Sequence, residues 1–302
     1  MDVNIFKEFS MALQTQHEDK NLIHASQDPS DIVVVTYNDT TYFVARPPVN
    51  KVYRHSLEKD EFFLELSVLL QRFTPETDAW FANHCQDNRM LNALVDTAIT
   101  YLKQNEEILK PNQKPPLVIF DIDETVLTLY TAFKTYFTSL PYSSEIVSRL
   151  PVFGDMIIDQ LTIVRPIQRL YQFLVSHGVS MAFVTGRPET VKTRFISERQ
   201  VRAIGYTQAI GLFMCPSKWE GTVATWKEHA RQELSQSFQI VMTIDDDCNN
   251  LQGGHLGACA LWVPSILDQW KEEDTFFATL LQAKKISEST IRPATQLQDE
   301  LF

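Results

Sequence analysis

Short apolar runs alternate with segments of helical periodicity from Pro116 onward. The runs are almost continuously apolar, which is typical of strands in a parallel sheet that is covered on both faces. Their alternation with helices predicts an α/β fold built on a doubly wound parallel sheet. The expected strands are Leu117–Phe120, Ser180–Val184, Ala209–Cys215, Ile240–Ile244 and Ala258–Val263, and the expected helices are Arg165–His177, Pro188–Ile204 and Trp219–Leu234.

The chain before this region has a different pattern. Residues 32–45, "IVVVTYNDTTYFVA", are two β-rich runs around Asn-Asp, which favours a tight hairpin. Helical periodicity follows at residues 57–73 and again where Leu91, Leu94, Val95, Ala98, Tyr101 and Leu102 share one face. The polar, proline-bearing segment "LKPNQKPP" indicates a connector. We therefore predict an N-terminal α+β extension over residues 1–112 and an α/β domain over residues 113–302.

The charge of the chain limits its partners. Its formal net charge of −11 argues against a nucleic-acid polymer, because phosphate backbones are bound by an excess of Lys and Arg. A small phosphorylated substrate remains compatible with this charge, since a metal ion can supply positive charge locally.

The sequence shows neither a membrane-spanning segment nor a signal peptide for export. No run approaches the roughly 18 apolar residues of a membrane span, and the first 20 residues lack the apolar core of a signal peptide. The 4 cysteines form no C-x-x-C pair and no zinc-like spacing. We therefore expect a cytoplasmic protein that does not bind membranes, with signal-independent export as the open alternative.

Chemically active residues gather at the ends of the expected strands. In doubly wound sheets, ligands bind outside the carboxyl ends of the strands, so the motifs "FDIDET", "FVTGRP" and "IDDD" are expected at one edge. A lysine from the helix that follows Cys215 is expected to join them. The candidate site residues are Asp121, Asp123, Thr185, Gly186, Arg187, Lys218, Lys227, Asp245, Asp246 and Asp247.

This set of residue types suits phosphoryl transfer. Carboxylates from two strands hold Mg²⁺ through oxygen ligands, and the metal neutralises the phosphate so that an anionic nucleophile can approach it. A hydroxyl, a lysine and backbone N–H groups bind the equatorial oxygens. A second carboxyl protonates the leaving group and later activates water.

The motifs "FDIDETVL", "FVTGRP", a helix lysine and "IDDD" together resemble the haloacid dehalogenase (HAD) superfamily of aspartate-nucleophile phosphotransferases, and most closely its acid-phosphatase branch. The resemblance covers about residues 116–264. It implies a magnesium-dependent phosphomonoester phosphatase. Asp121 would be the nucleophile that forms an aspartyl-phosphate, Asp123 the general acid and then the base, and Thr185 a ligand of the transferring phosphate.

The resemblance also implies a metal site and a catalytic lysine. Asp121, Asp245 and Asp246 would bind Mg²⁺ together with the backbone carbonyl of Asp123, although the triple aspartate leaves open which two of its members are ligands. Lys227 is the expected catalytic lysine from its spacing to the last acidic motif.

Lys218 is the alternative catalytic lysine, because it lies near the expected start of the helix. We also assign Lys218 to substrate binding, with Thr185, Gly186 and Arg187 of the Thr-Gly-Arg turn.

Residues 128–163 are rich in aromatic side chains and are a candidate cap that selects the substrate; the alternative is a helix packed on the core. The expected partner is a small phosphorylated molecule or a phosphoprotein. The alternative function is a catalytically weak phosphate-binding or protein-interaction module with the same fold. The sequence does not indicate the physiological substrate or the oligomeric state.

Overall fold

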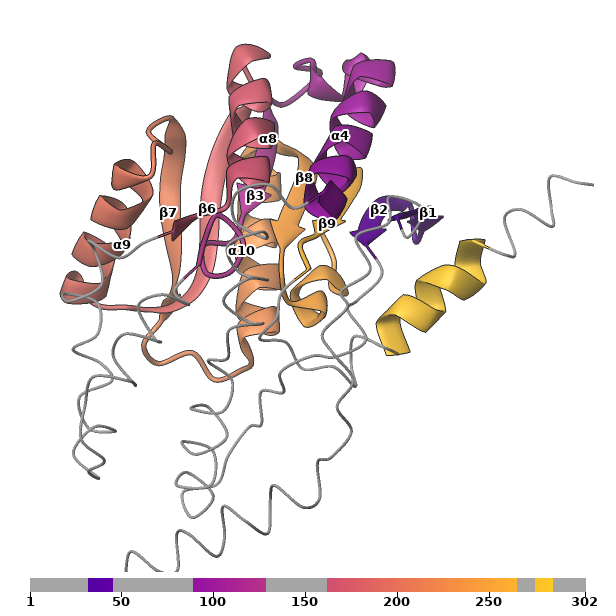
Figure 1. Cartoon of the computed structure of the whole chain (residues 1–302). Helices are drawn as coiled ribbons and strands as arrows, with labels where there is room; N and C mark the ends of the chain where they lie inside the picture. Colours follow the sequence, from indigo (N-terminus) through magenta and orange to yellow (C-terminus); the bar gives the residue numbers. More distant parts are fainter. Residues whose placement is uncertain (1–31, 46–88, 129–161, 265–274, 285–302) are drawn as a thin grey trace, which may run out of the picture.

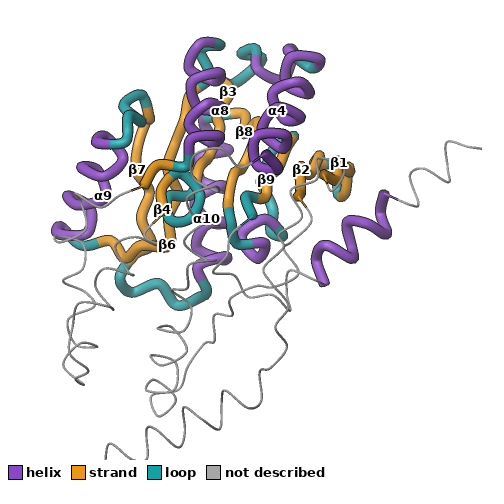
Figure 2. Tube along the Cα trace, in the orientation of Figure 1, coloured by secondary structure: helices purple, strands orange, loops and turns teal. Residues whose placement is uncertain are grey.

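The structure is a computed structural model of the chain, and it describes residues 32–45, 89–128, 162–264 and 275–284. Within these residues, seven strands form one mainly parallel sheet in the order β1-β2-β9-β8-β3-β6-β7, with helices packed against both faces (Figures 1 and 2). The predicted α/β fold with a doubly wound sheet is confirmed. None of the described helices is both long and apolar enough to span a bilayer.

The strands of the large sheet are β1 (Ile32–Tyr37), β2 (Thr40–Ala45), β3 (Pro116–Phe120), β6 (Ser180–Glu189), β7 (Ala209–Pro216), β8 (Gln239–Asp245) and β9 (Cys259–Trp262). The α-helices are α4 (Arg89–Gln104), α8 (Arg165–Ser176), α9 (Val191–Ala203) and α10 (Val223–Ser237), and residues 275–284 are also helical. Two 3₁₀ turns, η2 (Glu106–Leu109) and η5 (Cys248–Leu251), and a small ladder of β4 (Leu127–Thr128) with β5 (Thr162–Ile163) complete the described elements.

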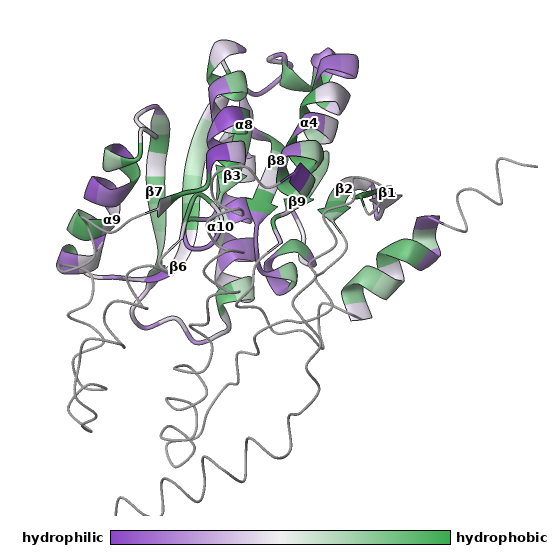
Figure 3. Ribbon diagram, viewed as in Figure 1, coloured by the Kyte–Doolittle hydropathy of each residue, from purple (hydrophilic) through white to green (hydrophobic). Residues whose placement is uncertain are grey.

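The two faces of the sheet bury different helices. Side chains alternate across a strand, so Val118 and Phe120 of β3 lie under α4 and α8, which are neighbours on one face (Figure 1). Leu117 and Ile119 lie on the other face, where they pack with Trp226 and other apolar residues of α10. The covering helices carry both apolar and hydrophilic residues (Figure 3). Their apolar sides close the core, and none of these described helices covers the carboxyl ends of the strands.

Two helices begin later than the sequence pattern predicted. The expected start of α9 at Pro188 is wrong, because Pro188 and Glu189 continue β6 and pair with β7. Thr190 then caps the helix by accepting from the N–H of Thr193. The expected start of α10 at Trp219 is wrong for a similar reason, since Thr222 is the residue that caps it. Hydroxyl side chains at the N-cap satisfy backbone N–H groups that a helix start leaves free.

The predicted hairpin is confirmed and belongs to the large sheet. Asn38 and Asp39 have φ values of 47° and 62°, the left-handed conformation that a tight two-residue turn requires. β2 pairs in parallel with β9, so a segment from the start of the chain extends the sheet beside one from its far end. The predicted boundary between residues 112 and 113 stays a prediction, and the predicted helix at residues 57–73 lies outside the described residues.

The helix expected around Leu91 to Leu102 is also present, as α4 with those side chains largely buried. The candidate cap over residues 128–163 lies outside the described residues except at its ends. Thr128 pairs with Thr162 in the β4–β5 ladder, so the segment begins and ends at neighbouring positions.

Candidate active site

The turn after β3 carries the first acidic pair. The backbone N–H of Asp121 donates to the carbonyl oxygen of Ile244 on β8 at 2.9 Å, which ties the two strand ends together. The chain turns at Glu124, whose φ is 56°. Its carboxylate oxygens lie 3.1 and 3.0 Å from the hydroxyl of Thr128, which donates to them. Asp121 is buried in this arrangement, whereas the side chain of Asp123 is 34% exposed.

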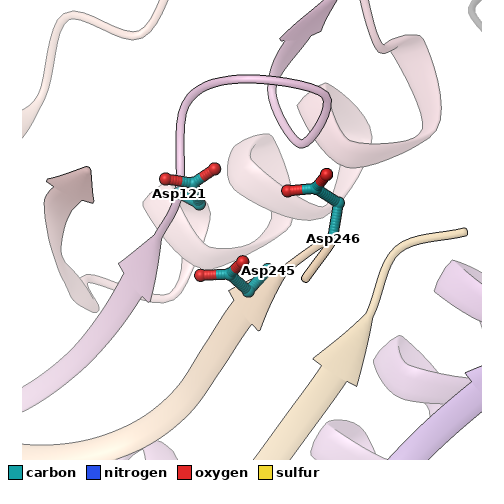
Figure 4. A group of neighbouring side chains, drawn as sticks. All are labelled: Asp121, Asp245 and Asp246. Atoms are coloured by element: carbon teal, nitrogen blue, oxygen red, sulfur yellow. The ribbon is translucent and has the colours of Figure 1, made fainter. Parts of the chain in front are cut away.

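The three adjacent aspartates at the end of β8 divide into two groups. Asp245 and Asp246 lie beside Asp121, and one carboxylate oxygen from each of the three lies within 4.8 Å of the others (Figure 4). Asp247 instead caps η5, where its carboxylate accepts from the N–H of Asn249 at 2.9 Å. Two carboxylates of the triplet therefore face the β3 turn, and the third stabilises the start of a 3₁₀ turn.

Neighbouring donors orient these carboxylates. Oδ1 of Asp245 accepts from Nδ2 of Asn250 at 2.8 Å and from the N–H of Asp247 at 3.1 Å. Oδ1 of Asp246 accepts from the hydroxyl of Thr125 at 3.3 Å. A carboxylate oxygen has about two acceptor positions, so Oδ1 of Asp245 is fully used, whereas Oδ2 accepts one bond, from Nζ of Lys227.

Lys227 of α10 lies between the two strand tips. Its side chain is 4% exposed, and Nζ lies 2.8 Å from Oδ1 of Asp121 and 2.6 Å from Oδ2 of Asp245. Burial alone lowers the pKa of Lys227, but the two carboxylates outweigh it and raise the pKa above its ordinary value. Lys218, the other candidate, lies in an exposed turn after β7.

The Thr-Gly-Arg turn lies at the end of β6. Thr185 is buried, its hydroxyl oxygen accepts from the N–H of Arg187 at 3.2 Å, and its carbonyl oxygen accepts from Nε1 of Trp226 at 3.0 Å. A Cβ at Gly186 would lie 2.7 Å from Cγ1 of Val223. Glycine at this position therefore lets α10 approach the end of β6 closely.

The guanidinium of Arg187 binds Asp123. Nε donates to Oδ2 of Asp123 at 2.8 Å and NH2 donates to Oδ1 at 2.6 Å. This two-point geometry is the one that arginine forms best with a carboxylate.

Among the described residues, the charges of the site do not balance without a further cation. Burial raises the pKa of Asp121 to about 7; Lys227 opposes this shift, while Asp245 and Asp123 add to it. Three clustered carboxylates face one ammonium group, and Arg187 is already paired with Asp123. Fully ionised, the cluster carries an excess of two negative charges, which a divalent cation would neutralise.

The structure brings most of the predicted site residues together. Those that meet at the carboxyl edge of the sheet are Asp121, Asp123, Thr185, Gly186, Arg187, Lys227, Asp245 and Asp246. Lys218 lies instead in an exposed turn, and the side chain of Asp247 caps η5. Sequence reasoning did not identify Asn250, Ser197 or Gln200, because single polar residues within apolar patterns carry no distinctive signal.

Comparison with known families agrees with this geometry. The model of the HAD superfamily, subfamily IIIB (Acid phosphatase), matches residues 68–277, more than half of the chain. The chain belongs to this acid phosphatase family. It is therefore a phosphatase, a hydrolase of phosphoric monoesters, and the HAD family generally uses a divalent metal.

Solved structures similar to this HAD phosphatase are distant in sequence. The class C acid phosphatase from Bacillus anthracis with tungstate bound is 17% identical, with a TM-score of 0.46 over 62% of this chain and 84% of that one. A hydrolase from Streptococcus pneumoniae TIGR4 is 12% identical, with a TM-score of 0.36 over 50% of this chain and 94% of that one. No curated protein sequence matches this chain.

Proposed function

We propose that this acid phosphatase is a magnesium-dependent phosphomonoesterase that works through an aspartyl-phosphate formed on Asp121. The observation that supports the proposal is the buried contact of Asp121 with Lys227, beside the carboxylates of Asp245 and Asp246. A nucleophilic carboxylate must lie next to cations, because it attacks a phosphate that is itself anionic.

The donor set fits Mg²⁺. Asp121, Asp245 and Asp246 supply hard oxygen ligands, which Mg²⁺ prefers, and no sulfur or imidazole group is among them. The backbone carbonyl of Asp123 is the further ligand expected from the family. When bound, a divalent cation would neutralise the negative charge of the substrate phosphate.

The first chemical step is attack on phosphorus. An Oδ atom of Asp121 forms a bond to phosphorus as the bond from phosphorus to the leaving oxygen breaks. Asp123, protonated at this point, gives its proton to the leaving oxygen, and the product is an alcohol.

The second step is hydrolysis of the aspartyl-phosphate. Asp123, now a carboxylate, takes a proton from a water molecule whose oxygen bonds to phosphorus. The bond from phosphorus to Asp121 breaks, inorganic phosphate leaves, and Asp121 returns as a carboxylate while Asp123 is again protonated.

Two further side chains bind the transferring phosphate in this proposal. Thr185 accepts a hydrogen bond from the backbone of Arg187, so its own O–H can donate to a phosphate oxygen. Lys227 already neutralises the nucleophile, and it is the ammonium group that lies closest to the attacking oxygen among the described residues.

The proposed substrate is a small phosphorylated molecule or a phosphoprotein. The excess of acidic residues in the chain disfavours a long polyanion. The segment that begins and ends at the β4–β5 ladder is the proposed selector of the leaving group, because Leu127 of that ladder forms a β-bridge with Asp123.

The test uses the purified full chain with 4-nitrophenyl phosphate. We expect phosphate release that stops in EDTA, returns with Mg²⁺, and is abolished by Asp121→Asn, because the amide is nearly isosteric but a much poorer nucleophile. Asp247→Asn is the matched control, since Asn is an equally good N-cap. Activity in EDTA would contradict the metal site, and full activity of Asp121→Asn would contradict the nucleophile.

A further inference from the structure

Two polar side chains of α9 are buried without belonging to the phosphate or metal site. Ser197 is 0% exposed and Gln200 is 2% exposed. A buried hydroxyl or amide is unfavourable unless it is hydrogen-bonded, and residues three apart on a helix lie on the same side. Both side chains point to one partner, the guanidinium of Arg187.

Arg187 connects these two residues to Asp123. Its NH1 group donates to Oγ of Ser197 at 2.8 Å and to Oε1 of Gln200 at 2.5 Å, while Nε and NH2 hold the two oxygens of Asp123. Arginine has about five N–H donors, and these four contacts use all but one. In this arrangement protein groups accept most of the N–H donors of the guanidinium, so we do not assign Arg187 mainly to binding the substrate phosphate.

An irregularity in β6 aims Arg187 at this position. The pairing of β6 with β7 shifts between Thr185 and Pro188, so Gly186 and Arg187 have no partner residue on β7. Such a bulge redirects a side chain that would otherwise alternate with its neighbours. The side chain of Arg187 is only 13% exposed as a result, and it lies between the turn after β3 and the inner side of α9.

We propose that Ser197 and Gln200 are positioning residues that act through Arg187 to fix the carboxyl group of Asp123 for proton transfer. The inference rests on the proposed function, in which Asp123 is the acid and base. Each oxygen of Asp123 accepts one bond from Arg187, so the guanidinium fixes the plane of the carboxyl group that the leaving group and then water would face.

The inference makes a prediction that depends on the leaving group. An alkoxide must receive a proton as it leaves, whereas a nitrophenolate leaves without one. Misplacement of a catalytic group by about 1 Å can cost on the order of 10²-fold in rate. Loss of the α9 contacts should thus lower kcat/KM for an alkyl phosphate by about 10- to 100-fold, and for 4-nitrophenyl phosphate by much less.

The test compares glycerol 2-phosphate with 4-nitrophenyl phosphate in saturating Mg²⁺. Ser197→Ala with Gln200→Leu removes both acceptors of the NH1 group. The control Arg202→Met, at an exposed position of the same helix, should stay within about threefold of wild type on both substrates. Melting curves of each variant show whether the fold is intact, and Gln200→Leu alone replaces the double variant if that one does not fold.

Two outcomes would overturn the inference while the phosphatase proposal survives: an equal loss of kcat/KM on both substrates, or no loss on either. If the wild-type protein releases phosphate from neither substrate, the proposed function itself fails. A selective loss on the alkyl phosphate in the double variant, absent from Arg202→Met, supports the positioning role, because a merely structural defect would affect both substrates alike.

Discussion

At the scale of single residues, the site depends on one buried ammonium group shared by two carboxylates. Lys227 contacts Asp121 of β3 and Asp245 of β8. Burial raises the pKa of Asp121, and Lys227 opposes that shift. In the proposed mechanism the same contact directs Asp121 as the nucleophile and reduces its repulsion of a phosphate.

Replacing Lys227 by methionine keeps an unbranched apolar side chain and removes the charge. By analogy with loss of a single oxyanion donor, we expect kcat to fall on the order of 10²–10³-fold. The matched control is Lys218→Met, which removes an exposed lysine and should leave kcat within about threefold of wild type, since lone surface charges contribute little. Steady-state assays with 4-nitrophenyl phosphate check both, and the reverse ranking would contradict the role given to Lys227.

Asp246 permits a test of the proposed metal site that leaves the proposed nucleophile, Asp121, intact. Asp246→Asn retains an oxygen that can accept from Thr125 but removes one negative charge. Because the affinity of oxygen sites follows the charge of their ligands, the Mg²⁺ concentration for half-maximal activity should rise by about tenfold or more. Magnesium titrations of this variant and of Asp247→Asn provide the comparison. Equal requirements in the two variants would argue that Asp246 is not a ligand.

At the scale of elements, α10 supports the site through two buried cations. Arg231, 1% exposed, donates from NH1 to the carbonyl oxygen of Asn250 at 3.0 Å and from Nε to that of Gly254 at 3.1 Å. Asn250 in turn donates to Asp245. One helix thus contacts Asp245, a proposed metal ligand, directly through Lys227 and also holds the loop that orients it.

Arg231→Met should weaken this loop. Loss of the donor to the buried Asn250 carbonyl is expected to cost about 1–3 kcal/mol of the free energy of unfolding, and the Mg²⁺ requirement should rise as Asp245 loses support. Arg202→Met, at an exposed position of α9, is the control and should change stability by less than about 0.5 kcal/mol. Urea denaturation measures both. A stable Arg231→Met protein with unchanged Mg²⁺ dependence would show that the loop keeps its structure without Arg231.

At the scale of the whole molecule, the sheet joins distant parts of the chain. The hairpin of β1 and β2 attaches to β9, and the hydroxyl of Thr40 donates to the carbonyl oxygen of Gly257 at 3.0 Å. Gly257 has a φ of 93°, and a Cβ there would lie 2.5 Å from the carbonyl oxygen of Ile240 on β8. The entry into β9 therefore requires glycine on two grounds, backbone conformation and space.

Gly257→Ala should destabilise the protein more than the same change at Gly178. Gly178 has a φ of 68° with no atom within 4 Å of the added Cβ, so its substitution adds only the cost of a left-handed backbone, about 1–2 kcal/mol. At Gly257 the backbone of β8 must also move. Urea denaturation measures the loss in the free energy of unfolding of each variant. Equal losses would show that the backbone of β8 moves at no measurable cost.

The sequence by itself determined the strands β3, β6, β7, β8 and β9 and the acidic and Thr-Gly-Arg motifs that follow them. A buried parallel strand needs an apolar run, and the turn after it holds polar groups. Both patterns involve neighbouring residues, so the sequence alone predicts them. The motifs meet at one edge because parallel strands all have their carboxyl ends at the same edge of the sheet.

Only the tertiary structure decided which side chains contact one another. Lys218 and Lys227 are nine positions apart in the sequence. Only the start of α10 at Val223 and the side on which it packs bury Lys227 against Asp121 and leave Lys218 exposed. The pairing of Arg187 with Asp123 likewise depends on a bulge and on a separate helix. Such contacts join residues far apart in the chain, and their energies depend on burial and distance, which no local pattern records.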